Sequence, residues 1–135
     1  MRRLLILAVA SIALAAAPAA LASPTLRLTI VHALRGCHVW GSADSQPFGP
    51  TKTLTVTRGT KLEIRVSCPM PFAVVQTAGP ALALASPWQT GTAHTLVFAK
   101  KGLYRLQATN LVSSTDAGLQ TLGPDNVLVL SVRVR

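Results

Sequence analysis

Two-residue alternation of apolar and polar side chains is the feature that most constrains the fold of this chain. After residue 23, short apolar runs alternate with Thr, Lys, Arg or Glu, and no stretch keeps the 3.6-residue period of an amphipathic helix. Leu62, Ile64 and Val66, for example, alternate with polar neighbours. The alternating runs are 25–31, 53–57, 61–67, 72–76, 92–99, 103–109 and 126–135. One-sided alternation predicts antiparallel-type sheets packed on one core, hence an all-β sandwich of about seven strands.

Glycine and proline divide these runs. Gly59 separates 53–57 from 61–67 and can adopt a positive φ at little cost, so we expect these two runs to form a hairpin. Segment 79–92 is interrupted by Pro80, Pro87 and Gly91 and is predicted to be a connecting loop. The polar segment 110–124 is predicted to be a second loop.

The first 22 residues have the pattern of a secretory signal peptide. Two arginines precede an apolar run from Leu4 to Ala17, and small residues stand at the two positions a signal peptidase reads. We expect cleavage between Ala22 and Ser23, which leaves one domain at 23–135, no transmembrane segment, and a secreted protein in the periplasm or outside the cell. The alternative is an uncleaved membrane anchor, because the apolar segment is nearly long enough to cross a bilayer.

Charge and motif content narrow the function classes. Cleavage would retain 11 of the 13 basic residues and all four acidic ones, a net charge of +7, which predicts weak attraction to anionic surfaces. The basic residues are spread along the chain, without the aromatic interleaving of a nucleic-acid site, so we expect no specific nucleic-acid partner. Nothing in the sequence names another partner or ligand. The acidic residues are dispersed, and no nucleophile elbow, zinc-protease helix or phosphate-binding loop occurs. We therefore expect a protein that is not an enzyme.

Three segments, taken in order, resemble the cupredoxin-like family. They are the Gly-joined pair at 54–64, the short strand at 71–75 and the pair at 95–106. The resemblance spans roughly residues 26–134 and implies a Greek-key β-sandwich.

The copper ligands of that family are not at the expected places. Blue-copper members use two His, one Cys and a weak axial Met. The resemblance implies that the first His would begin the strand at 72–75, where Phe72 or a neighbour stands instead. The other donors would lie on the loop that runs to Pro124, which contains no Cys, His or Met. We therefore expect the fold without a standard blue-copper site and without a cofactor.

Cys37 and Cys68 are the two cysteines, and an even count in a secreted chain favours a disulfide. The resemblance implies that the strand ending near 32–40 and the strand ending at Cys68 are parallel neighbours, which would place both cysteines at one end of the sandwich. Closing a loop of about 30 residues would stabilise the fold by about 3–4 kcal/mol in the chain-entropy model.

Copper binding is the alternative to a disulfide at this end of the predicted sandwich. His38 and Met70, with Cys37 or Cys68, would supply imidazole and soft sulfur, which suit copper(I). Adjacent strand residues point to opposite faces, so Cys37 and His38 could share an ion only across a turn or bulge, for which Gly36 or Gly41 would serve. Two functions therefore stay open: a secreted, non-enzymatic binding or structural domain, or a copper-binding or electron-transfer protein with non-standard ligands.

The remaining histidines and the tryptophans are less specific. His94 shares a predicted face with apolar residues, and His32 follows the apolar face of its strand, so both are expected to be structural. Trp40 and Trp88 could fill the core or form an exposed aromatic platform for a ligand, and both alternatives remain open at this point.

Overall fold

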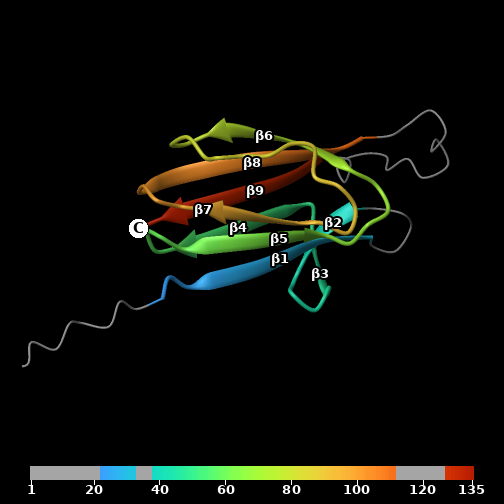
Figure 1. Ribbon diagram of the computed structural model, residues 1–135, viewed down its shortest axis with the longest axis horizontal. Coiled ribbons are helices and arrows are strands. Elements are labelled where there is room, and N and C mark those ends of the chain that lie inside the picture. Colours follow the sequence, from blue (N-terminus) through green and yellow to red (C-terminus); the bar gives the residue numbers. More distant parts are fainter. Residues whose placement is uncertain (1–21, 33–37, 112–126) are drawn as a thin grey trace, which may run out of the picture.

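The computed structural model describes residues 22–32, 38–111 and 127–135, and within these residues every regular element is a strand. The strands face one another in two layers (Figure 1). They are β1 (Thr25–His32), β2 (His38–Gly41), β3 (Pro47–Gly49), β4 (Thr51–Val56), β5 (Lys61–Val66), β6 (Phe72–Ala78), β7 (Ala93–Val97), β8 (Gly102–Asn110) and β9 (Val127–Val134). The predicted all-β sandwich is confirmed. The count exceeds the expected seven because β2 and β3 are too short to show an alternating pattern.

The two sheets are mixed rather than antiparallel throughout. The order is β3-β2-β1-β5-β7 in the five-stranded sheet and β4-β9-β8-β6 in the four-stranded sheet. Each sheet contains one parallel pair, β1 with β5 and β4 with β9. Alternation shows that one face of a strand is buried, but it does not fix the direction of the neighbouring strand. The parallel β1–β5 pair is the neighbour relation that the family resemblance implied.

The predicted hairpin around Gly59 is wrong. β4 and β5 lie in different sheets, and the turn between them crosses from one layer to the other. Gly59 does take a positive φ of 85°. Its backbone N–H donates to the carbonyl of Phe98 at 2.8 Å, and the Phe98 N–H donates to the carbonyl of Thr60 at 3.1 Å. Each flanking strand pairs with partners distant in sequence, which a local pattern cannot reveal.

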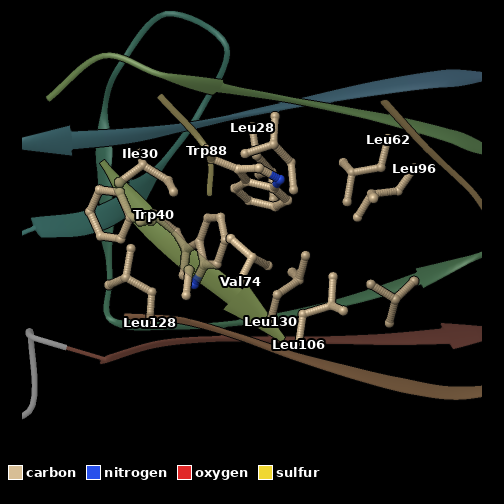
Figure 2. Packing of buried hydrophobic residues seen from close by; sticks show 14 of the residues in the cluster. Leu28, Ile30, Trp40, Leu62, Val74, Trp88, Leu96, Leu106, Leu128 and Leu130 are labelled. Atoms are coloured by element: carbon tan, nitrogen blue, oxygen red, sulfur yellow. The ribbon is translucent and has the colours of Figure 1, made fainter. Parts of the chain in front are cut away.

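Both tryptophans belong to the core, which answers the question that the sequence left open. Trp40 and Trp88 are 1% and 0% exposed. The indole N–H of Trp40 donates to the carbonyl of Val129 at 3.0 Å, so its polar atom is satisfied across the sandwich. Figure 2 shows both rings among the side chains that the two sheets direct toward each other. Trp88 comes from the predicted loop at 79–92, which is confirmed as a connection without strands between β6 and β7.

Several sequence predictions fall outside the described residues. Most of the predicted signal peptide, Cys37 and nearly all of the loop at 110–124 lie there. Signal cleavage and the Cys37–Cys68 disulfide therefore remain predictions. In the part of the chain that the structure describes, no helix has the length and apolar character to span a membrane.

Candidate functional site

One end of the sandwich gathers residues from four separate segments. β1 ends at His32 and its antiparallel partner β2 begins at His38, so these two residues face each other in register. β5 runs parallel to β1 and leads into Cys68 and Met70 at the same end. Asn110 closes β8 and is paired with Phe72, the first residue of β6. The strand pairing alone therefore brings the predicted residues His38, Cys68 and Met70 together.

Asn110 joins His38 to Met70. Its side-chain Nδ2 donates to His38 Nδ1 at 2.9 Å and to Met70 Sδ at 3.6 Å. All three residues and Phe72 are buried. We call His38, Met70, Phe72 and Asn110 the end cluster. Because Nδ1 accepts a hydrogen bond, the ring proton of a neutral His38 resides on Nε2.

The surroundings of His38 favour its neutral form. Its ring meets the rings of His32 and Phe72 edge-on, with centroids 5.1 and 5.5 Å away. Burial, and to a lesser extent the neighbouring His32, lower the pKa of His38 below its ordinary value. A neutral imidazole is the form that binds metals, but here its Nδ1 lone pair is directed at the amide of Asn110.

Cys68 lies near the end cluster as a buried thiol. Its side chain is 0% exposed, and its Sγ contacts the carbonyl oxygen of Met70 at 3.7 Å. Burial raises the pKa of the Cys68 thiol to about 11. A thiol with that pKa stays protonated at neutral pH and is a poor nucleophile and a poor metal ligand.

The residues present do not fit a type 1 copper site. Phe72 begins β6, the place at which the family resemblance implies the first His, and its ring is 0% exposed. Residues 111–126 contain no Cys, His or Met that could supply the remaining donors. Across the described ranges, three or more His, Cys, Asp or Glu residues nowhere come together in an arrangement able to hold a metal ion.

Two polar residues take roles that the sequence reasoning missed or misplaced. Asn110 continues the series of buried positions 104, 106 and 108 in β8, and a polar residue in that register was the signal that could have identified it. His32 was expected on the buried face, but it is exposed at the end of β1. Its ring still contacts the His38 ring in an edge-on arrangement.

His94 has the structural environment that was expected. Its ring stacks on Trp88 with centroids 5.1 Å apart and an interplanar angle of 15°. Its Nε2 lies 2.8 Å from Thr92 Oγ1. Burial lowers the pKa of His94.

Comparison with protein-family models and with curated proteins finds no match. Similar solved structures include a reduced amicyanin mutant with 16% identity, which covers 85% of this chain and 86% of that one with a TM-score of 0.49. A second reduced amicyanin mutant has 14% identity, 82% coverage of each chain and a TM-score of 0.48. The purple cupredoxin from Nitrosopumilus maritimus has 18% identity, covers 79% of this chain and 98% of that one, and has a TM-score of 0.46. Likeness at this level says nothing about which residues of this chain bind a metal.

Proposed function

We propose that this cupredoxin-like sandwich is a secreted, non-enzymatic binding or structural domain whose histidine end is a closed polar core. The observation that carries the proposal is the double hydrogen bond from Asn110 to His38 Nδ1 and Met70 Sδ. A buried donor shared by two buried acceptors stabilises a fold without a ligand. Phe72 fills the position where a metal-binding His would begin its strand.

The contact between Thr92 and His94 resembles the hydroxyl–histidine pair of a catalytic site, but its hydrogen bonds support a structural role. Thr92 Oγ1 donates to the carbonyl of Gln89 at 2.6 Å, so toward His94 Nε2 it acts as acceptor. A hydroxyl whose proton is held by a turn carbonyl is not an activated nucleophile, because the histidine does not take its proton. This arrangement supports the proposal that the chain is not an enzyme.

Secretion is supported by the pattern of residues 1–22, with its basic start, apolar run and small residues before Ser23. Mass spectrometry of the protein recovered from its natural host should give an N-terminus at or near Ser23. An intact N-terminus in the membrane fraction would instead establish the anchor alternative.

A second candidate function, copper binding, rests on the same geometry. The lone pairs of His38 Nδ1 and Met70 Sδ converge on one point, the nitrogen of Asn110, and Cys68 lies nearby. If the Asn110 amide turned away, His38 and Met70 would hold a copper(I) ion together with Cys68 or Cys37. Bound copper would supply one-electron transfer. Binding would have to displace a satisfied amide and deprotonate a thiol with a pKa of about 11, which is why we place it second.

Copper titration separates the two functions. Metal-free mature protein is titrated with copper(I) against a chromophoric chelator, and with copper(II) while the visible spectrum is recorded. We expect no withdrawal of copper(I) from the chelator and no intense thiolate-to-copper band. Stoichiometric binding that is lost in His38→Gln and Met70→Leu but retained in His94→Gln would establish the copper function instead.

Thiol counting tests the predicted Cys37–Cys68 bridge independently. Unreduced protein unfolded in denaturant should show no reactive thiol if the bridge exists. After reduction, Cys68 should react slowly in the folded protein and fast in denaturant, because the folded thiol is buried and its pKa is about 11. Two free thiols in the unreduced, unfolded protein would disprove the bridge.

A further inference from the structure

A polar groove lies on the outer face of the five-stranded sheet, away from the end cluster. Its volume is about 510 Å³. β1 and β5 form its floor, and the connection from β2 to β3 forms one wall. The floor residues alternate along their strands with Leu28, Leu62 and Ile64, which point into the core. The polar residues that line the groove are Arg27, Thr29, Ser45, Glu63, Arg65 and Ser67.

The parallel register sets which charges on the groove floor meet. Arg27 lies beside Glu63, and Thr29 lies beside Arg65. Arg27 Nε forms an ion pair with Glu63 Oε1 at 3.4 Å. Among the described residues, Arg65 has no carboxylate within ion-pair distance. The groove therefore holds one neutralised arginine and one whose planar fork of N–H donors is available to an oxyanion.

The wall of the groove is fixed by its own hydrogen bonds. Thr29 Oγ1 donates to the carbonyl of Ser42 at 2.5 Å, and this side chain ties the wall to the floor. The Ser42 N–H donates to the carbonyl of Gln46 at 2.9 Å, and the Ser45 N–H donates to the carbonyl of Ser42 at 3.0 Å. Gly41 permits the close approach, because a Cβ there would lie 3.1 Å from Thr29 Oγ1. The rim is therefore formed before any ligand arrives.

Ser45 stands at the rim in a costly conformation. Its φ is 68°, the only positive φ of a non-glycine residue among those described. Left-handed backbone at such a residue is uncommon and occurs preferentially at functional sites. Here it places a serine, with its hydroxyl, on the lining of the groove.

We propose that this groove binds an acidic sugar through its oxyanion and hydroxyl groups. The guanidinium of Arg65 would take the carboxylate or sulfate, the hydroxyls of Ser45 and Ser67 would bond the ring oxygens, and Glu63 would accept from ring hydroxyls. The volume is within the range of small-ligand sites. The excess of basic over acidic residues in the chain favours an anion. The proposal concerns a different face from the end cluster and holds whether or not that cluster binds copper.

Titration with matched sugars tests the proposal. The amide NMR spectrum of the mature protein is followed with glucuronate, glucose, glucose 6-sulfate and inorganic sulfate, each at the same ionic strength. We expect saturable shifts in the lining residues with glucuronate or the sugar sulfate, at least tenfold weaker shifts with glucose, and weaker shifts with sulfate alone. The preferred acidic sugar identifies whether the oxyanion is a carboxylate or a sulfate. Equal affinity for glucose, or sulfate binding as tight as the acidic sugars, would overturn the proposal, as would no saturable shift with any of them.

Arg65 and Arg133 provide a matched pair of variants. Both are exposed strand arginines, but Arg133 lies on β9 in the other sheet. Arg65→Gln should weaken binding of the preferred sugar at least tenfold, Arg65→Lys less, because it keeps the charge and loses the fork. Arg133→Gln should leave affinity unchanged. Equal losses in Arg65→Gln and Arg133→Gln would show nonspecific attraction to a basic protein and overturn the site.

Discussion

The end cluster and the groove are both built from polar side chains that the fold collects from distant segments, yet their polar atoms are used in opposite ways. In the end cluster, Asn110, His38 and Met70 are buried and bond one another. In the groove, Arg65 is exposed and has no carboxylate partner among the described residues. A buried polar group must find a partner inside the protein, whereas an exposed one is satisfied by water and can exchange that water for a ligand. Burial, more than residue type, separates a structural cluster from a binding surface.

The largest effect is expected when the central donor of the end cluster is removed. Asn110→Ala deletes both hydrogen bonds and leaves His38 Nδ1 without its donor in a buried space. We expect the free energy of unfolding to fall by about 2–4 kcal/mol, measured by urea denaturation. Gln107→Ala on the outer face of the same strand is the control and should cost within about 0.5 kcal/mol. Equal small losses in both variants would mean that the hydrogen bonds of Asn110 contribute no more to stability than an exposed side chain does.

The second largest effect is expected at acidic pH, where protonation of His38 and His94 should destabilise the fold. Burial lowers the pKa of His38 and of His94 in the folded protein, so near pH 6 the unfolded chain binds more protons than the folded one. The stability contributed by the neutral rings is fully present above the ordinary histidine pKa of about 6.5 and is lost as the pH falls below it. We expect the free energy of unfolding to decrease between pH 7 and pH 5, and the decrease to be smaller in His38→Gln. A flat profile over this range would contradict the assignment.

A smaller loss of stability is expected when the thioether of Met70 is removed from the end cluster. Met70→Leu keeps the volume of the side chain but removes the acceptor for Asn110 Nδ2 at 3.6 Å. We expect a loss of less than about 1.5 kcal/mol by thermal or urea unfolding, because Asn110 keeps its bond to His38. A loss as large as that of Asn110→Ala would show that the thioether, rather than the imidazole, holds the cluster together.

The smallest effect on stability is expected in the groove. Arg65→Gln removes a side chain that is exposed and has no carboxylate partner among the described residues. The free energy of unfolding should change by no more than about 0.5 kcal/mol, even where sugar binding is lost. A destabilisation of several kcal/mol would mean that Arg65 serves the fold and would remove the contrast with the end cluster.

The resemblance to the cupredoxin-like family, and the absence of copper-ligand residues at the positions it implies, could be predicted from the sequence. Phe72 at the start of β6, and a segment 111–126 without Cys, His or Met, are the sequence features on which the expectation of no type 1 copper site depends. The location of His38, Cys68 and Met70 at one end of the sandwich was expected, because the resemblance implied that the strands leading to them are parallel neighbours. Asn110 was overlooked, because its importance depends on the side chains of two other segments that only the folded chain brings to it. The groove also escaped prediction, since its floor and wall come from β1, β5 and the connection after β2.

The sequence by itself determined which face of each longer strand is buried, because side chains alternate along a strand whatever its partner, and Leu128, Leu130 and Val132 in β9 all face the core as their spacing predicted. Only the tertiary structure decided that β4 and β5 lie in different sheets, that β4 pairs in parallel with β9, and that Asn110 meets His38. Alternation is a local property of the backbone. Strand pairing depends on the path of the whole chain, which also determines whether a polar side chain becomes buried with a partner or remains exposed in a groove.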